Sequence, residues 1–173
     1  MLIITKKITK ILKNKNITQY KLAGLIGYDH GALGHMIRGE RPFTDEIIQK
    51  IAPILDVSPE QIKGWVIADK YPKNILKMAL KVKQEADQQA GILILTVKID
   101  EALKDKGLSR TGLSGVIGYS QGKLNQMIKG DEPISPLVIS KIAPVLEVSE
   151  EEIVSWVVAG KYSVEALWIS LDE

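Results

Sequence analysis

The chain has 173 residues, 45% hydrophobic and 25% charged, a composition that excludes disordered and fibrous proteins. It contains no cysteine, which excludes disulfides, thiol catalysis and cysteine-based zinc sites. No apolar run reaches the roughly 18 residues that a membrane span needs, and the first residues lack the order of a signal peptide, so we expect a cytoplasmic protein with no membrane partner.

The sequence contains an internal repeat. A shift of 91 positions aligns residues 1–82 with residues 92–173 without a gap, and about 35 of the 82 pairs are identical. We therefore expect two tandem domains, 1–82 and 92–173, joined by the polar segment 83–91, which is typical of a helix tail plus linker. Lys and Arg outnumber Asp and Glu by 14 to 7 in the first repeat but number 8 against 12 in the second. The charges of +7 and −4 indicate a polyanionic partner for the first repeat.

Apolar residues recur at helical spacing, and no useful stretch alternates like a strand, so the sequence predicts an all-α fold. In the first repeat, one helix runs to about Lys15. Thr18 caps a second helix, which stops at Gly27. A third helix spans about residues 29–38 and ends at Gly39. Matching helices are expected 91 positions later in the second repeat.

The rest of each repeat predicts two or three more helices. A fourth starts near Thr44, and Pro53 in its last turns should bend it or end it early. A capping box of Ser58 and Gln61 starts a fifth helix. A sixth, with Leu76 and Leu80, closes the repeat. The expected architecture is thus two five- to six-helix domains, each with a helical extension at its C-terminal end.

Three motifs carry a family resemblance. Thr-Gln-x-x-Leu-Ala-x-x-Ile-Gly is followed by Leu-x-x-Met-Ile-Arg-Gly and then by Ile-x-Lys-Ile-Ala-x-x-Leu-x-Val-Ser. This pattern resembles the phage-repressor (Cro-like, xenobiotic-response-element type) helix-turn-helix family, over residues 5–62 and, in register, 96–153. The resemblance implies that the third helix enters the DNA major groove while the second crosses the backbone, with double-stranded DNA as the partner.

The third helix divides into a buried and an exposed face. Leu33, Met36 and Ile37 share one stripe and are expected to face the core. Gly31 and Gly34 are placed on the opposite face, where they offer no side chain to read bases. The candidate base-reading residues are His30 and His35 in the first repeat and Gln121, Lys123, Asn125 and Gln126 in the second. Because Gln and Asn amides can bond adenine bidentately, the second repeat is expected to be the stronger reader.

Basic and polar side chains around the third helix are candidates for phosphate contacts. In the first repeat they are Lys13, Lys15, Gln19, Lys21, Arg38 and Arg41, and in the second Lys104, Lys106, Arg110 and Lys129. Gln19 and Arg110 match the family position that touches a phosphate at the start of the second helix. The loop sequence Glu40-Arg41 becomes Asp131-Glu132 in the second repeat, which predicts weaker backbone contact there.

Other kinds of site have little support in the sequence. His30 and His35 lie five positions apart on different sides of a helix, so a shared metal is not expected, and no cofactor is indicated. No catalytic motif is present, so we do not expect an enzyme. Trp65 and Trp156 are interpreted as core residues, with a partner surface or effector pocket as the alternative.

Two functions remain open at this stage. The first is a sequence-specific transcriptional regulator, in which one chain acts as a pseudo-dimer on an asymmetric DNA site. The alternative is a protein-interaction or antitoxin-like module on the same scaffold, with only one repeat or neither on DNA. A protein partner would then bind the acidic second domain or the segments around Trp65 and Trp156.

Overall fold

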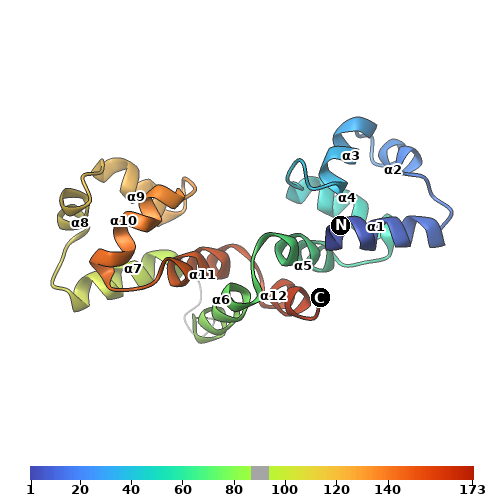
Figure 1. Ribbon diagram of the computed structural model, residues 1–173. Coiled ribbons are helices and arrows are strands. Elements are labelled where there is room, and N and C mark those ends of the chain that lie inside the picture. Colours follow the sequence, from blue (N-terminus) through green and yellow to red (C-terminus); the bar gives the residue numbers. More distant parts are fainter. Residues whose placement is uncertain (87–93) are drawn as a thin grey trace. The chain divides into compact units, whose positions relative to one another are not determined.

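The computed structural model describes residues 1–86 and 94–173 and confirms the all-α prediction (Figure 1). Within these ranges there are 12 helices and no strand. The first repeat forms α1 (Ile3–Asn14), α2 (Gln19–Leu25), α3 (His30–Ile37), α4 (Asp45–Leu55), α5 (Pro59–Lys70) and α6 (Lys73–Ala86). The second forms α7 (Ile94–Asp105), α8 (Arg110–Val116), α9 (Gln121–Lys129), α10 (Pro136–Leu146), α11 (Glu150–Lys161) and α12 (Val164–Leu171). The expected linker 83–91 begins inside α6, and the remainder of it lies outside the described residues.

The chain divides into two compact units. The first comprises residues 1–73 together with 165–173, and the second comprises residues 74–164. Each unit holds the first five helices of one repeat. The last helix of each repeat, however, is assigned to the other unit, so the units differ from the expected ranges 1–82 and 92–173. The first unit includes nearly all of α12, because α12 packs against α5 at Gly64. None of the helices in the described ranges is long and apolar enough to span a membrane.

Local sequence signals set the helix starts as predicted. The side chain of Thr18 accepts a hydrogen bond from the backbone of Lys21 at 3.1 Å and so caps α2. Ser58 and Ser149 each complete a capping box with the residue three positions later, at the start of α5 and α11. These caps satisfy backbone N–H groups that have no partner within the helix.

Of the two effects expected of Pro53, a bend or an early end, the early end is not observed. Helix α4 continues through Pro53 to Leu55, and α10 continues through Pro144 to Leu146. Each proline lies in the last turn, so its missing N–H removes only one hydrogen bond near an end that is already weakly bonded. The helix ends instead at Asp56, whose φ of 53° is left-handed.

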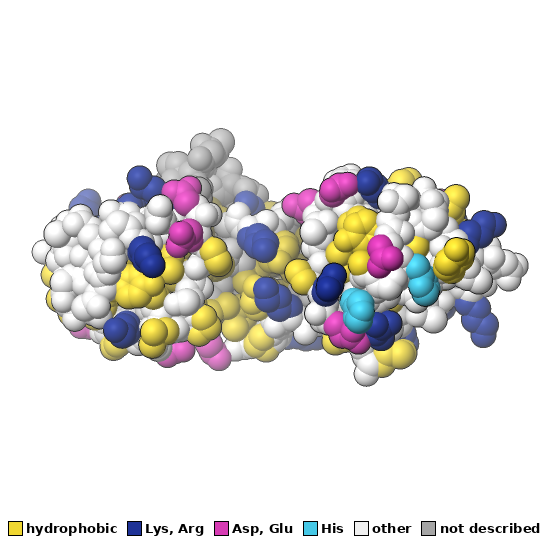
Figure 2. Space-filling model, turned by 90° about the horizontal axis from the view of Figure 1, so that it is seen from above, with side chains coloured by type: hydrophobic (Ala, Val, Ile, Leu, Met, Phe, Trp, Pro, Cys, Tyr) yellow, Lys and Arg dark blue, Asp and Glu magenta, His cyan; other side chains and the backbone are white. Residues whose placement is uncertain are grey.

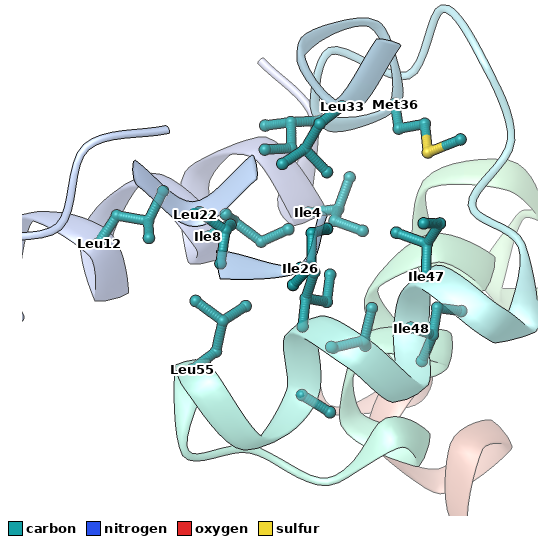
Figure 3. Packing of buried hydrophobic residues seen from close by; sticks show 14 of the residues in the cluster. Ile4, Ile8, Leu12, Leu22, Ile26, Leu33, Met36, Ile47, Ile48 and Leu55 are labelled. Carbon is teal, nitrogen blue, oxygen red and sulfur yellow. The ribbon is translucent and has the colours of Figure 1, made fainter. Parts of the chain in front are cut away.

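The apolar stripe of α1 lies at the centre of the first unit. Ile4, Ile8 and Leu12 are buried and pack with residues of α2, α3 and α4 (Figure 3). Trp65 on α5 belongs to the same cluster and is only 5% exposed, and Trp156 in the second unit is 7% exposed. Both tryptophans are therefore core residues, as the sequence indicated, and present little surface to a partner.

Asp69 at the end of α5 caps the start of α1. Its two carboxylate oxygens accept hydrogen bonds from the backbone N–H groups of Ile3 at 2.7 Å and Ile4 at 2.9 Å. The N-cap residue of α1, Leu2, offers no side-chain cap of its own. A distant carboxylate thus joins the first and fifth helices and faces the positive end of the α1 dipole.

Removal of this cap should destabilise the first unit. We expect Asp69→Ala to lower its free energy of unfolding by about 0.5–2 kcal/mol, as for other lost N-caps. Denaturant unfolding measures the loss of stability, and hydrogen exchange shows whether the loss affects α1. Gly160 occupies the aligned position in the second unit, so Gly160→Ala is the control and should not destabilise. Equal protection of α1 in Asp69→Ala and the unmodified chain would contradict the cap.

Candidate nucleic-acid interface

A tight turn joins the second and third helices of each unit. Gly27 and Gly118 adopt left-handed φ values of 64° and 62°, which glycine adopts without strain. The following residues, Tyr28 and Tyr119, donate backbone hydrogen bonds to Ala23 and Ser114 at 2.9 and 3.0 Å. The turn therefore closes in the same way in both units and directs α3 and α9 across the preceding helix.

The buried face of the third helix is as predicted. Leu33, Met36 and Ile37 of α3 are buried, and so are the aligned residues of α9. The C-terminal end of each helix is also anchored to the first helix of its unit. Thr5 donates its hydroxyl hydrogen bond to the Ile37 carbonyl at 2.5 Å, and Thr96 donates to the Ile128 carbonyl at 2.7 Å.

The first turn of the third helix is braced by the second helix, through chemistry that differs between the units. The rings of Tyr20 and His30 lie 5.5 Å apart in the first unit. At the aligned positions, Gln121 donates to the Thr111 hydroxyl at 2.7 Å. Tyr20 and Thr111 were not among the predicted site residues, although their constant spacing of ten positions from His30 and Gln121 was a usable signal. These contacts orient two of the candidate base-reading residues.

Gly34 is not open to solvent, contrary to the expectation from the sequence. It is buried, and a Cβ built there would lie 3.1 Å from an Nη of Arg38 and 3.6 Å from Nε2 of Gln19. The absent side chain lets these two polar groups cross the helix. The aligned residue Asn125 is half-buried, with its Oδ1 enclosed and without a hydrogen-bond partner in the described structure.

The other candidate base readers are exposed. His30 and His35 point from one face of the first unit, where acidic and basic side chains lie beside one of them (Figure 2). Gln121, Lys123 and Gln126 are exposed on α9. Asp29 caps α3 by accepting a hydrogen bond from the Ala32 N–H at 2.7 Å.

Glu40 joins two candidate DNA-contacting residues in the first unit. One of its oxygens accepts from Nε of Arg38 at 2.7 Å, and the other is hydrogen-bonded to Nδ1 of His35. The hydrogen bond from Arg38, followed by that from His35, lowers the pKa of Glu40 to about 2. A lowered pKa means that the carboxylate interactions are complete above the ordinary value and are lost only as the pH falls toward 2. At neutral pH, Glu40 therefore neutralises Arg38.

This pairing leads to a testable expectation for DNA binding. Glu40→Gln should release Arg38 and raise the affinity for random DNA, with a log–log salt dependence steeper by about 0.9, the value for one added phosphate contact. Gel-shift titration of the full chain at several salt concentrations measures this slope. Asp131→Asn is the matched control, because it removes the same charge at the aligned position without a recorded side-chain partner among the described residues. The same slope change in both variants would show that Arg38 is not involved.

Three other basic residues predicted to contact phosphates also form ion pairs with carboxylates. Arg110 forms a two-bond ion pair with Asp100 on α7, at 2.7 and 2.6 Å. Lys15 pairs with Asp56 and Lys106 with Glu147, at aligned positions of the two units. The hydrogen bonds that Arg110 donates to the Asp100 carboxylate raise the pKa of Arg110 above its ordinary value. In the described part of the chain, the exposed candidates with no recorded carboxylate partner are Lys13, Lys21, Arg41, Lys104 and Lys129.

The fold and these helices define a class: an all-α protein that carries two helix-turn-helix units. Family comparison gives the same result. Residues 8–62 match the family described as helix-turn-helix, and residues 98–159 match the Cro/C1-type HTH DNA-binding domain. Together the two matches show that the chain contains two tandem Cro/C1-type helix-turn-helix domains. Comparison with curated proteins and with solved structures finds no significant match.

These domains suggest a DNA-binding regulator, with DNA as the partner, and point away from an enzyme. Among the described residues, no group of three or more His, Asp or Glu side chains is placed so that it could hold a metal ion. The chemistry of the interface is hydrogen bonding and charge, supplied by the third helix and the basic groups around it.

Proposed function

We propose that the protein is a sequence-specific transcriptional regulator in which each unit reads one half of an asymmetric DNA site. One observation carries this proposal. The buried stripe, the turn and the threonine anchor are the same for α3 and α9, whereas their exposed side chains differ. Identical supports with different reading residues suit two half-sites of different sequence.

The two units divide the contacts differently. In the second unit, Gln121, Lys123 and Gln126 present amide and ammonium groups to base edges, and Asn125 adds the part of its amide that is not enclosed. In the first unit, His30 and His35 are the base-reading candidates. The exposed lysines and Arg41 contact phosphates directly, whereas Arg38, Arg110, Lys15 and Lys106 do so after exchanging a carboxylate for a phosphate.

The ion pairs favour a second candidate function. Four of the ten predicted phosphate-contacting residues are neutralised by carboxylates of their own unit. Because fewer basic side chains are then free to bind phosphates, the chain suits a protein-interaction module, or a protein in which only one unit binds DNA.

Selection of randomised DNA by the full chain, followed by gel shifts at low and moderate salt, tests these functions. Two different half-sites in the enriched sequence support the pseudo-dimer. A footprint that covers a single half-site would mean that only one unit reads DNA. Binding that shows no preferred sequence and disappears above about 100 mM salt would favour the interaction module, because purely electrostatic binding depends steeply on salt.

A further inference from the structure

Helix α12, at the end of the described chain, packs on the first unit. Figure 1 shows α12 beside α5, and residues 165–173 belong to the same compact unit as residues 1–73. Ile169 packs against the core cluster that contains Trp65. The last helix of the second repeat thus completes the hydrophobic core of the first domain.

Gly64 makes the approach of α12 to α5 possible. A Cβ at this position would lie 2.5 Å from Cγ2 of Ile169, 2.8 Å from its Cβ and 3.1 Å from the backbone oxygen of Ala166. Any side chain on Gly64 would therefore displace α12. The aligned residue of the second unit is Ser155, which is fully buried and bonds to the Glu152 carbonyl at 2.6 Å. The glycine contact is specific to the first unit.

Charge holds the C-terminal end of α12 in the same unit. Nζ of Lys7 on α1 lies 2.8 Å from Oε1 of Glu173. Nζ of Lys73 donates to the Leu171 carbonyl at 3.4 Å. Lysines beside the last carbonyls of a helix and beside its terminal carboxylates are favourable, because the helix dipole is negative there.

Helix α6 lacks the features that hold α12. The repeat aligns Asp172 and Glu173 with Lys81 and Val82, so α6 in this place would bring a lysine toward Lys7. Residues 72–82 and 163–173 share only two identical pairs among eleven, far fewer than the rest of the repeat. The charges are also more evenly divided between the observed units than between the repeats. The first unit has 12 basic and 10 acidic residues and the second has 11 of each, whereas the repeats carry net charges of +7 and −4.

We propose that the face of α1 and α5 around Gly64 is a docking site dedicated to the chain's own residues 164–173, selected over α6 by the acidic end of α12. The first DNA-binding domain is then complete only when residues 164–173 of the same chain are in place. This inference concerns assembly of the first unit and does not depend on DNA binding.

Zero-length cross-linking of the unmodified full chain tests the site. A carbodiimide activates the Glu173 carboxylate, and attack by the Lys7 amine forms an amide as the activator leaves as its urea. We expect mass spectrometry of the monomer to find the Lys7 peptide joined to the Glu173 peptide. Lys7→Arg keeps the charge but cannot form a stable amide, so it should remove this product alone. A product found only in covalent dimers, a Lys98–Glu173 product at the aligned lysine, or no Lys7 product would overturn the proposal.

A glycine pair tests the dependence of the first domain on α12. Gly64→Ala should reduce the cross-link yield several-fold, lower the midpoint of thermal unfolding and increase hydrogen exchange in α1 and α5. Gly160→Ala gains the same helix propensity with no described atom within 4 Å, so its midpoint should stay or rise. If Gly64→Ala matches Gly160→Ala in yield and midpoint, α12 does not dock there. If Gly64→Ala cannot be folded while Gly160→Ala can, the dependence is supported, and the Lys7→Arg comparison still tests the site.

Discussion

Replacement of both Gln121 and Gln126 by alanine is expected to reduce the preference for the selected DNA over random DNA by about 30-fold or more, because two contributions are lost. Each well-placed amide that bonds a base in two places contributes roughly 1–3 kcal/mol of discrimination. Both side chains are exposed on α9, and the Thr111 hydroxyl orients Gln121. Affinity for random DNA should change little, because neither residue carries charge. Competition gel shifts with selected and random DNA measure the ratio.

The aligned pair in the first unit provides the comparison. His30→Ala with His35→Ala should alter preference in the other half-site and leave the bases opposite α9 unaffected. Lys13→Ala should instead weaken binding to both DNAs alike and reduce the salt dependence. Equal losses on selected and random DNA for the glutamine pair would mean that these residues do not read bases.

The local part of the fold could be predicted from the sequence because its signals lie within a few residues of one another. Thr18, Ser58 and Ser149 cap helices that start directly after them, and apolar spacing identified the buried stripe of α3. The failure at Pro53 shows the limit of local signals. A helix breaker in the last turn sacrifices one hydrogen bond, and the packed residue Leu55 beyond it keeps the helix intact.

The parts that were missed depend on which side chains meet, both near and far along the chain. Gly34 was expected to be open, but the side chains of Gln19 on α2 and of Arg38, one helical turn later, lie over it. Glu40 was treated as a loop carboxylate, while in the structure it neutralises Arg38. The ion pairs Lys15–Asp56 and Lys106–Glu147 had a signal in the sequence, because both repeats keep opposite charges at the aligned positions. Periodicity alone does not say which charges meet.

The closing helix shows why a repeat is an incomplete guide to domains. Alignment predicts that each repeat closes on itself, since both have a helix at that place. The only sign of different packing partners in the sequence is the divergence of α6 from α12, in which Lys81 is aligned with Asp172. Net charge per repeat was misleading for the same reason, because the acidic end of the second repeat lies on the first unit.

Matched core substitutions should separate the two units. Leu33→Ala and Leu124→Ala each remove a side chain that is 0% exposed, and each should lower the free energy of unfolding of its own unit by about 2–5 kcal/mol. Hydrogen exchange during denaturant titration assigns the loss to α1–α5 or to α7–α11.

The effect on DNA binding should then differ between the variants. Leu124→Ala disturbs the support of α9 and should lower sequence preference at least as much as the glutamine pair does. Leu33→Ala should mainly weaken the contribution of the first unit. Leu25→Ala, which truncates an exposed leucine on α2, is the control and should change stability by less than about 0.5 kcal/mol. If Leu33→Ala unfolded both units together, the units would not be independent, and loss of preference could no longer be attributed to one reading helix.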